Sequence, residues 1–331
     1  MRGIKKLYFS RFNKINKKKE IPDLIKRSGI KILFPFYHVV SDNDLPHIKN
    51  LYSYKNVAQF DDDLDFFLKY YKPLNIDDFS SGNYNKNENY FVLSFDDGLK
   101  QMFETVAPVL KARAVPAIFF INSAFADNKG LFYRYIISLI IEELKNENKL
   151  FLTGKFLKEK DLKFSSIPDF LLDISYSNKE LIYDIANICG LDIFEFLNIY
   201  QPYLTSDQMK KLITEGFALG AHSMDHPNYN TISEESQISQ TLHSVKFIKD
   251  NFHQQYNYFA FPFTADGVAV KVFDVLHNQL MVQHSFGTAG IYNKPDSAFI
   301  NRIPMEIENY SAEEIIKNEY AYYLLKKKFG R

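Results

Sequence analysis

The 331-residue sequence predicts an α/β fold in which helices cover a mostly parallel sheet. Short apolar runs bounded by polar residues alternate along the chain with amphipathic segments at helical spacing, the pattern of repeated strand–helix–strand units. Between about residues 127 and 205 this alternation gives way to helical patterns joined by polar connectors. We therefore expect a basic N-terminal segment over 1–30, one α/β domain over 31–126 and 206–331, and a mostly helical insertion over 127–205.

The first half of the α/β domain is expected to alternate between strands and helices. Each predicted strand is a short, mostly apolar run, and each predicted helix places apolar side chains three or four positions apart. The clearest helix carries Phe60, Leu64 and Phe67 on one face and acidic residues on the other. In chain order we expect a strand over 31–38, a helix over 57–71, a strand over 91–95, a helix over 99–112 and a strand over 115–121.

The same alternation resumes after the insertion. Inside the insertion, apolar stripes predict helices over 131–144 and 179–188. After it we expect helices over 206–215, 233–251 and 312–326, and strands over 217–222, 256–261, 280–286 and 299–305. Because parallel strands end at a common edge of the sheet, polar residues that directly follow them are candidates for a shared site.

The charge and cysteine content exclude several classes of protein. Lys plus Arg and Asp plus Glu both number 40, so no basic surplus points to a nucleic-acid partner. Cys189 is the only cysteine, which excludes an internal disulfide framework and a cysteine-based zinc site. The partner is therefore expected to be small or uncharged.

Residues 1–30 concentrate basic side chains around Leu7, Phe9, Phe12 and Ile15. Such a segment can make a peripheral contact with an anionic membrane surface, and a solvated, frayed terminus is the alternative. No apolar run reaches the length of a signal-peptide core or the ~20 residues of a spanning helix. These features predict a cytoplasmic protein, peripheral at the inner face of the membrane if the basic segment binds lipid.

Two carboxylates stand side by side where the predicted strand 91–95 ends, in Ser94-Phe-Asp-Asp-Gly98. Ligands of α/β sheets gather at the carboxyl ends of the strands, and a cation would relieve the repulsion between Asp96 and Asp97. In the alternative interpretation, one Asp caps the following helix and the other lies in solvent. The pair is thus a candidate part of a metal site.

Two histidines follow the predicted strand 217–222, in Gly220-Ala-His-Ser-Met-Asp-His-Pro227. His222 and His226 are four positions apart, a chelating spacing, and imidazole is the commonest nitrogen ligand of zinc. Together with the Asp pair they predict an Asp-His-His metal site with open positions, as in catalytic rather than closed structural sites. Zn²⁺ suits this ligand set best, although nickel, cobalt or iron can occupy the same mixed site.

These motifs resemble those of the polysaccharide deacetylases with a NodB-type domain, carbohydrate esterase family 4. Ser94-Phe-Asp-Asp-Gly98 is similar to the family's T/S-F-D-D-G motif, and His222-Ser-Met-Asp-His226 matches its H-S/T-x-x-H motif. Phe259-Ala-Phe-Pro-Phe263 resembles the third motif, usually R-x-P-Y/F. The resemblance covers about residues 30–125 and 205–305, and it implies a distorted (β/α) barrel of fewer than eight strands.

The resemblance implies a role for each residue of the two clusters. Asp97 would hold the metal ion together with His222 and His226. Asp96 would be the general base that removes a proton from the attacking water, while the ion polarises the acetamide carbonyl. The site would then hydrolyse an acetylated substrate.

A leaving amine also needs a general acid. His38 is the expected acid, because Phe36-Tyr-His-Val-Val40 resembles the N-terminal strand of the circularly permuted deacetylases that act on poly-N-acetylglucosamine. His284, in Met281-Val-Gln-His284, is the alternative acid. A buried, hydrogen-bonded position at a strand end is the alternative role of His38.

One position departs from the family pattern. Ala260 stands where the third motif usually has an arginine that holds the catalytic Asp. Loss of that partner would leave Asp96 with a looser orientation and a less depressed pKa. Arg302, at another predicted strand, is expected to supply the charge instead, since a guanidinium fork orients a carboxylate well.

The predicted activity is metal-dependent removal of N-acetyl, or O-acetyl, groups from a sugar of a cell-surface polysaccharide or its precursor. We expect Tyr37, Pro262 and Phe263 to present apolar surfaces to this acetylated glycan. Two alternatives stay open: a catalytically inactive glycan-binding or scaffold protein, and a metal amidohydrolase acting on a small acylated substrate. The insertion over 127–205 can serve as a lid over the groove, as a dimer contact, or as neither.

Overall fold

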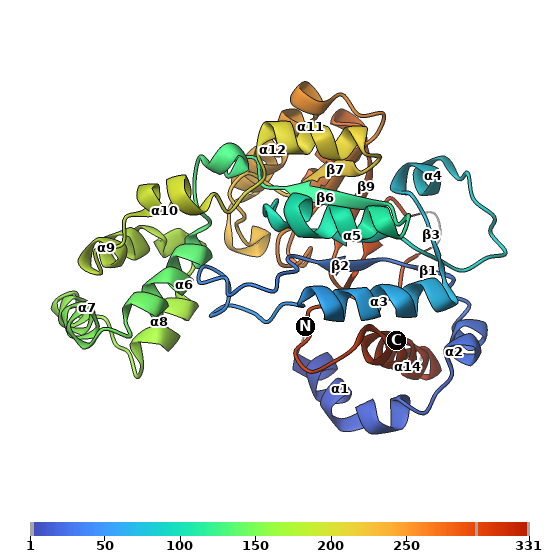
Figure 1. Cartoon of the computed structure of the whole chain (residues 1–331), viewed down its shortest axis with the longest axis horizontal. Coiled ribbons are helices and arrows are strands. Elements are labelled where there is room, and N and C mark those ends of the chain that lie inside the picture. The colour runs from blue at the N-terminus through green and yellow to red at the C-terminus, as the bar shows by residue number, and fades with distance from the viewer. Residues whose placement is uncertain (1–2, 295–296, 330–331) are drawn as a thin grey trace.

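The computed structural model describes residues 3–294 and 297–329 and is built around a parallel sheet that curls into a barrel (Figure 1). The sheet has eight strands in the order β10-β9-β8-β7-β6-β5-β2-β11, and neighbouring strands are parallel. The strands are β2 (Pro35–Tyr37), β5 (Leu93–Phe95), β6 (Ala117–Ile121), β7 (Ala218–Ala221), β8 (Asn257–Ala260), β9 (Val282–Gly287), β10 (Phe299–Asn301) and β11 (Ile303–Pro304). The predicted α/β fold with a parallel sheet is thereby confirmed.

The last segment of the sheet closes the barrel by pairing on both sides. β10 pairs with β9, β11 pairs with β2, and only Arg302 separates β10 from β11. The Arg302 amide donates to Gly287 O at 3.0 Å, and the next amide, of Ile303, donates to Phe34 O at 2.8 Å. The eight strands therefore lie on seven chain segments. The barrel expected from the resemblance is confirmed, but its sheet has eight strands rather than fewer.

Two of the predicted strands are each divided in the structure. The run 31–38 forms β1 (Ile32–Leu33) and β2, and residues 90–95 form β4 (Tyr90–Phe91) and β5. β1 and β4 join β3 (Lys72–Pro73) in a separate three-stranded sheet. The sequence did not reveal this division, because the apolar run continues across it.

Helices follow the strands and cover the barrel. Neighbouring residues of one strand fall in different apolar clusters: Phe119 packs in the larger one, and Phe120 packs in a smaller one with Phe286. Since side chains alternate across a strand, the smaller cluster fills the barrel interior and the larger one lies under the helices. The helices are α3 (Val57–Tyr70), α4 (Ile76–Ser81), α5 (Ala107–Ala112), which continues a π-helical turn over Met102–Val106, α11 (Ser206–Thr214), α12 (Glu234–Phe252), α13 (Val270–Asp274) and α14 (Ala312–Lys328).

Between β6 and α11 the chain forms five α-helices that extend to one side of the barrel (Figure 1). They share an apolar cluster that also includes Leu45 and Ile48 from the loop after β2. Asn50 of that loop donates to Glu142 Oε1 at 2.9 Å, so these helices are packed onto the barrel. They are α6 (Tyr133–Glu143), α7 (Glu147–Glu159), α8 (Ile167–Asp173), α9 (Glu180–Ile188) and α10 (Ile193–Tyr200).

The N-terminal residues form two helices that pack on the C-terminal helix. α1 (Gly3–Asn16) and α2 (Ile21–Ser28) both contact α14 (Figure 1). Phe9 is buried, and the Asn16 side-chain amide donates to Asn318 Oδ1 at 2.7 Å. The frayed terminus considered from the sequence is therefore wrong for the residues that the structure describes. Within those same residues, no helix combines the length and the apolar character needed to cross a bilayer.

Candidate functional site

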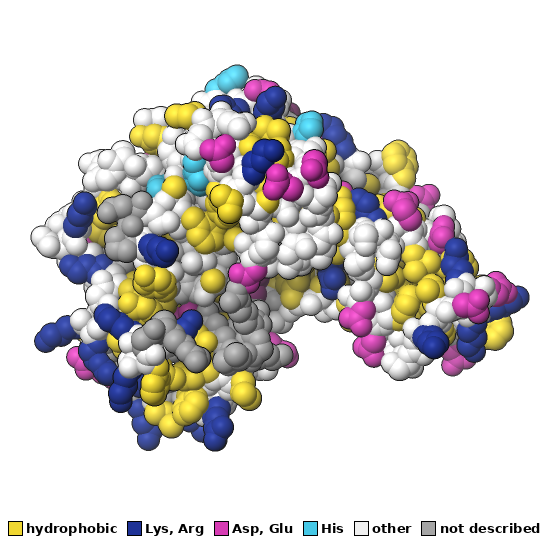
Figure 2. Space-filling view, turned by 180° about the vertical axis from the view of Figure 1, so that it is seen from behind, with side chains coloured by type: hydrophobic (Ala, Val, Ile, Leu, Met, Phe, Trp, Pro, Cys, Tyr) yellow, Lys and Arg dark blue, Asp and Glu magenta, His cyan; other side chains and the backbone are white. Residues whose placement is uncertain are grey.

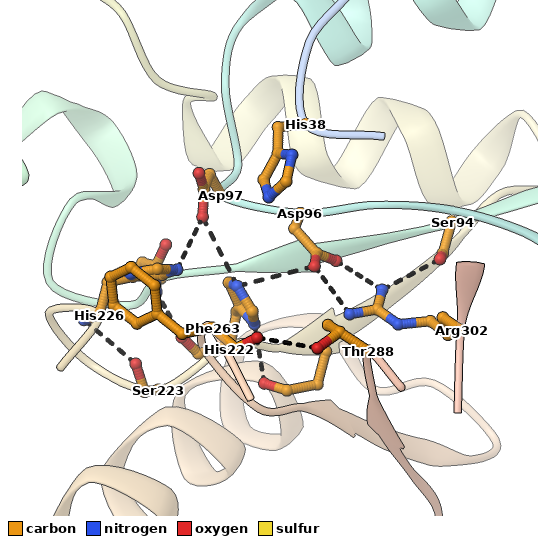
Figure 3. Close-up of polar contacts among 12 residues, drawn as sticks. His38, Ser94, Asp96, Asp97, His222, Ser223, His226, Phe263, Thr288 and Arg302 are labelled. Atoms are coloured by element: carbon orange, nitrogen blue, oxygen red, sulfur yellow. Dashed lines mark hydrogen bonds and ion pairs between the residues drawn. The ribbon is translucent and has the colours of Figure 1, made fainter. Parts of the chain in front are cut away.

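A sharp turn at the carboxyl end of β5 presents the two predicted carboxylates (Figure 3). Asp97 and Gly98 both have a positive φ, of 80° and 67°. A Cβ at position 98 would make only an ordinary contact, 3.4 Å from Ile121 Cδ1, so glycine suits this turn because of its conformation. The turn lets Asp96 and Asp97 face one small volume although they are neighbours in the sequence.

The loop after β7 brings both histidines to the same edge of the barrel. The His222 amide donates to Ile121 O at 2.9 Å, which extends the pairing with β6 as far as the first histidine. The chain then turns through Ser223 and His226, with φ of 65° and 60°. The His226 amide donates to Ser223 Oγ at 3.1 Å. This turn aims both imidazole rings at Asp97.

Asp97, His222 and His226 form a buried ligand set. Asp97 Oδ1 lies 3.2 Å from His226 Nε2 and 3.5 Å from His222 Nε2, and one ligand atom of each residue lies within 4.8 Å of the others. All three side chains are buried, yet Asp97 Oδ1 accepts no hydrogen bond from the described residues. A buried carboxylate oxygen that faces two imidazole nitrogens in this way fits a shared cation, so the residues present suit a metal ion.

The protonation states of the set agree with metal ligation. Burial lowers the pKa of His222 to about 4, so the ring is neutral at neutral pH, as a ligand must be. Its Nδ1–H donates to Ala260 O at 2.7 Å, which selects the tautomer with Nε2 free. Burial alone would raise the pKa of Asp97, but His226 and the other nearby histidines outweigh it and hold that pKa below its usual value.

The helical insertion supplies two residues of the site that were not predicted. The Tyr135 hydroxyl, on α6, donates to Asp97 Oδ2 at 2.9 Å. Phe132, just before α6, lies edge-on to His226 with ring centroids 4.6 Å apart. Tyr135 is fully buried, so it fixes the carboxylate of a ligand from behind. In a chain with 22 Tyr and 31 Phe, no sequence signal could single these two out.

Asp96 is held by Arg302 in a buried, two-pronged ion pair (Figure 3). Arg302 Nη1 and Nη2 donate to Asp96 Oδ1 and Oδ2, each at 2.7 Å, and Nη1 also donates to Ser94 Oγ at 3.0 Å. The guanidinium lies 4.4 Å and 5.0 Å from the ring centroids of Phe36 and Phe120. Burial alone would raise the pKa of Asp96, but the Arg302 charge outweighs it and lowers that pKa.

Arg302 thus pairs with Asp96 as expected from the sequence, and the loose orientation that Ala260 would otherwise cause does not arise. Arg302 reaches the carboxylate from the segment that closes the barrel, between β10 and β11. Position 260 lies at the end of β8 and contributes only its backbone carbonyl, to His222. Closure of the barrel brings Arg302 to Asp96 although the two are 206 positions apart in the chain.

His38 directly follows β2, and its ring lies beside the Asp pair (Figure 3). Glu306 Oε2 lies 2.5 Å from His38 Nδ1, and the Val39 amide donates to Glu306 Oε1 at 2.9 Å. Burial disfavours the protonated ring and so lowers the pKa of His38. The negative charge of Glu306 outweighs this effect and raises that pKa to about 9. The ring is therefore protonated at neutral pH. Glu306 was not predicted, and its only signal is a carboxylate directly after the predicted strand 299–305.

His284, the alternative acid, has a different environment. Its ring centroid lies 5.1 Å from that of Phe79 and 6.4 Å from that of Phe286. Burial lowers the pKa of His284 to about 4, so it carries no proton to give at neutral pH. The geometry therefore favours His38 as the candidate acid.

Of the three residues predicted to contact the sugar, one is placed to do so. Phe263 is 41% exposed, and its ring centroid lies 4.7 Å from that of His226. Pro262 is buried, and Tyr37 is fully buried with its hydroxyl bonded to a buried aspartate. The predictions for Tyr37 and Pro262 are therefore wrong. Because side chains alternate along a strand, the direction that brings His38 to the site turns Tyr37 away from it.

A buried carboxylate–imidazole set beside a paired aspartate, at the carboxyl edge of a parallel barrel, has the layout of an enzyme site. A sequence model of the family described as polysaccharide deacetylase matches residues 83–278, more than half of the chain. The chain therefore belongs to the polysaccharide deacetylase family. The matched region contains both metal-ligand motifs and the insertion between them.

Among curated proteins, the chain is similar to YxkH of Bacillus subtilis (strain 168), whose name places it among the polysaccharide deacetylases. The two are 30% identical over 63 residues, which is 19% of this chain and 23% of the relative. The similarity to this relative thus spans less than a quarter of its length.

Several solved structures share the fold. The Streptococcus pyogenes deacetylase PplD, in complex with acetate, has a TM-score of 0.56 at 16% identity, with 88% of this chain and 98% of that chain covered. IcaB from Ammonifex degensii has a TM-score of 0.55 at 14% identity, with 89% and 98% covered. A de-N-acetylase from Aggregatibacter actinomycetemcomitans has a TM-score of 0.56 at 17% identity, with 87% and 98% covered. At these identities the likeness is one of fold.

Proposed function

We propose that the protein is a metal-dependent deacetylase that hydrolyses N-acetyl groups on a sugar of a cell-surface polysaccharide or its precursor. The supporting observation is that Asp97, His222 and His226 converge on one point, with the arginine-held Asp96 and the protonated His38 beside them (Figure 3). A ligand set, a base and an acid are the three parts that hydrolysis of an amide requires.

Asp96 is suited to take a proton from the attacking water. It is ionised because Arg302 lowers its pKa, and its Oδ2 lies 3.8 Å from His222 Nε2, so the carboxylate borders the ligand set. Two parallel hydrogen bonds from one guanidinium fix the direction of the carboxylate. As the water attacks the acyl carbon, Asp96 accepts the proton that the water loses.

Asp97, His222 and His226 would hold the metal ion, and Zn²⁺ fits two imidazoles and one carboxylate best. A divalent cation bound there supplies Lewis-acid chemistry, because it polarises the acyl carbonyl and lowers the pKa of a coordinated water. The Ala260 carbonyl orients His222, and Tyr135 orients Asp97. The ligands are therefore oriented before any cation arrives.

Replacing Tyr135 by phenylalanine should weaken metal binding about tenfold or more, because Asp97 loses the hydrogen bond that orients it. The affinity for Zn²⁺ can be measured in competition with a chromogenic chelator. Tyr133→Phe is the matched control, since Tyr133 is a buried tyrosine of the same helix that makes no contact with Asp97 among those described. Equal affinity in the two variants would contradict a positioning role for Tyr135.

His38 is suited to protonate the leaving amine. An amide nitrogen leaves as a neutral amine only if it gains a proton, and a protonated imidazole beside the site can supply it. Glu306 keeps that proton on the ring at neutral pH.

The solved relative described as a de-N-acetylase supports N-acetyl rather than O-acetyl as the group removed.

The pH dependence of the reaction should report on His38. A general acid must be protonated, so the rate should fall as the pH rises through the pKa of His38, about 9. In Glu306→Gln the raising charge is lost while burial remains, so that pKa drops and the alkaline limb of kcat/KM moves to lower pH. Glu308→Gln, an exposed glutamate two positions away, should leave the profile unchanged. An unshifted alkaline limb in Glu306→Gln would exclude His38 as the acid.

Release of acetate tests the proposed activity directly. The purified protein is incubated with N-acetylated and O-acetylated oligosaccharides, before and after removal of metal by a chelator and its return as Zn²⁺. We expect acetate from the N-acetylated substrate, loss of activity on chelation and recovery with metal. Absence of acetate from every substrate, in protein shown to bind metal, would favour the glycan-binding alternative instead.

The exposed Phe263 suggests a comparison that would distinguish a sugar substrate from a small acylated one. Its ring stands beside His226 and is 41% exposed, so it offers an apolar face to a sugar ring next to the acetamide. Activity on an acetylated oligosaccharide well above that on a small acetamide would support the polysaccharide substrate.

The cytoplasmic location expected from the sequence stays a prediction, which fractionation of cells would test.

A further inference from the structure

Far from the metal-ligand motifs in the sequence, α1 presents a face that combines basic and apolar side chains. Among its exposed positions, 7, 11, 14 and 15 recur at helical spacing and line one side of the helix. Leu7 is 65% exposed and Ile15 is 59% exposed, which is unusual for aliphatic side chains on a helix that has a buried face of its own. The residues of this face are Leu7, Arg11, Lys14 and Ile15 of α1, together with Lys18 in the turn that follows it.

The end of α14 adds exposed apolar and basic residues next to this face. α1 and α14 are antiparallel, because Asn13 contacts Glu314 while Tyr8 contacts Tyr322, with ring centroids 5.1 Å apart. The start of α1 therefore lies beside the end of α14. That end carries exposed apolar and basic residues in a row, namely Leu325, Lys326, Lys327, Lys328 and Phe329. Figure 2 shows Lys and Arg side chains gathered with hydrophobic ones over this part of the molecule.

Charge is strongly polarised toward these two chain ends. Residues 1–19 contain eight Lys or Arg and no Asp or Glu, and residues 320–331 contain four Lys or Arg and no Asp or Glu. Since the chain has 40 basic and 40 acidic residues, the rest carries 28 basic and 40 acidic ones. The ends therefore have a formal charge of +12 and the remainder −12. An even distribution of the charged residues along the chain would not produce this separation.

Other exposed apolar side chains have different surroundings. The insertion exposes Phe151, Phe194 and Ile199, but its surface mixes acidic with basic side chains (Figure 2). Glu195, for example, is exposed directly after Phe194. The face on α1 and α14, by contrast, joins its exposed apolar residues to basic side chains.

We propose that this face of α1 and α14 docks the protein on an anionic membrane surface. Apolar side chains inserted at the headgroup boundary and basic side chains beside anionic headgroups are the two contributions that hold a peripheral helix on a bilayer. The face combines both, and its charge is complementary to anionic lipid. This docking does not depend on the proposed catalytic activity.

The contacts behind the face make it a rigid anchor. Asn16 donates to Asn318 at 2.7 Å, and Lys17 pairs with Glu314 at 2.6 Å. These bonds tie α1 to α14, which also packs on α3 of the barrel. Docking would therefore hold the barrel itself, with its site, at the surface of the bilayer.

Co-sedimentation of the full chain with vesicles tests the proposal. The probes are vesicles of phosphatidylcholine alone and of phosphatidylcholine with phosphatidylglycerol. We expect binding to the anionic vesicles that weakens as salt is raised. The triple variant Arg11→Gln/Lys14→Gln/Lys18→Gln should bind them about tenfold or more weakly. Leu7→Ser/Ile15→Ser should also weaken binding, and circular dichroism should show that both variants stay folded.

A second triple variant controls for net charge. Lys155, Lys158 and Lys163 are exposed on the insertion, and their replacement by glutamine changes the net charge equally at a different place. Its binding should match that of the unchanged protein. Equal binding by the α1 variant, equal loss in the insertion variant, or equal binding to vesicles without phosphatidylglycerol would each overturn the proposal.

Discussion

Replacing Asp96 by asparagine should lower the rate of acetate release about a hundredfold to ten-thousandfold while the protein still binds its metal ion. A carboxamide cannot accept the proton of the attacking water at neutral pH, whereas Asp97, His222 and His226 are left in place. Acetate release and metal content are measured on the same preparation. This would be the largest effect on the rate expected from any change that spares the ligand set.

Asp97→Asn is the matched control, because it makes the same chemical change at the adjacent position. It removes a ligand of the set, so both metal content and activity should fall. Retained activity in Asp96→Asn, or equal loss of metal in the two variants, would contradict the separate roles proposed for Asp96 and Asp97.

Removing the Arg302 guanidinium should have the largest expected effect on stability. In Arg302→Met the buried Asp96 carboxylate loses the two hydrogen bonds that compensate its charge, and such a loss costs about 3–5 kcal/mol. The free energy of unfolding is measured in urea at neutral pH. Arg113→Met is the control: Arg113 also pairs with two carboxylates, but at the surface, where an ion pair is worth about 1 kcal/mol or less.

The pH dependence of the Arg302 effect follows from the pKa of Asp96. In the unchanged protein that pKa lies below its usual value of 3.8, so the ion pair contributes fully above this value and its contribution is lost as the pH falls further. In Arg302→Met burial, the largest influence on Asp96, is no longer offset by the guanidinium, so the pKa of Asp96 rises and acid neutralises the unpaired charge more readily. The difference between the two proteins should therefore be largest at neutral pH and shrink below about pH 4.

A double variant separates the cost of the unpaired charge from the loss of catalysis. Asp96→Asn/Arg302→Met removes both charges, so its unfolding free energy should exceed that of Arg302→Met alone. It should nevertheless release no acetate, because it has no base. If Arg302→Met and Arg113→Met had equal effects on unfolding, the buried pair would not be the stabilising contact inferred here.

The insertion is a part of the site, and this outcome was open from the sequence. A lid and a dimer contact were the functional alternatives considered for residues 127–205. Tyr135 and Phe132 instead contact Asp97 and His226 directly, so the start of the insertion forms a wall behind the ligands. Because α6 also packs on the loop after β2, changes in the insertion should alter the positions of the Asp97 and His226 side chains.

Local patterns were sufficient to predict an Asp-His-His site, and the family resemblance chose Asp97 rather than Asp96 as its carboxylate ligand. Strand ends, a doubled carboxylate and a pair of histidines four positions apart are short-range features, and parallel strands bring their carboxyl ends to one edge whatever lies between them. Asp97, His222 and His226 therefore meet as the sequence predicted. The direction in which side chains point was predicted less well from the sequence. Tyr37 was expected to face the sugar, but the alternation along β2 allows only one of Tyr37 and His38 to do so.

The sequence by itself determined the alternation of strands and helices, the place of the insertion and the strand ends that carry the Asp pair and the two histidines, because each depends on residues close together in the chain. Arg302 was expected as the partner of Asp96, but only the tertiary structure decided that Glu306 acts on His38 and Tyr135 on Asp97. Arg302 reaches Asp96, Glu306 reaches His38 and Tyr135 reaches Asp97 across long stretches of chain. These contacts exist because the segment 299–304 closes the barrel and because the insertion packs back onto it, and neither event leaves a local pattern in the sequence.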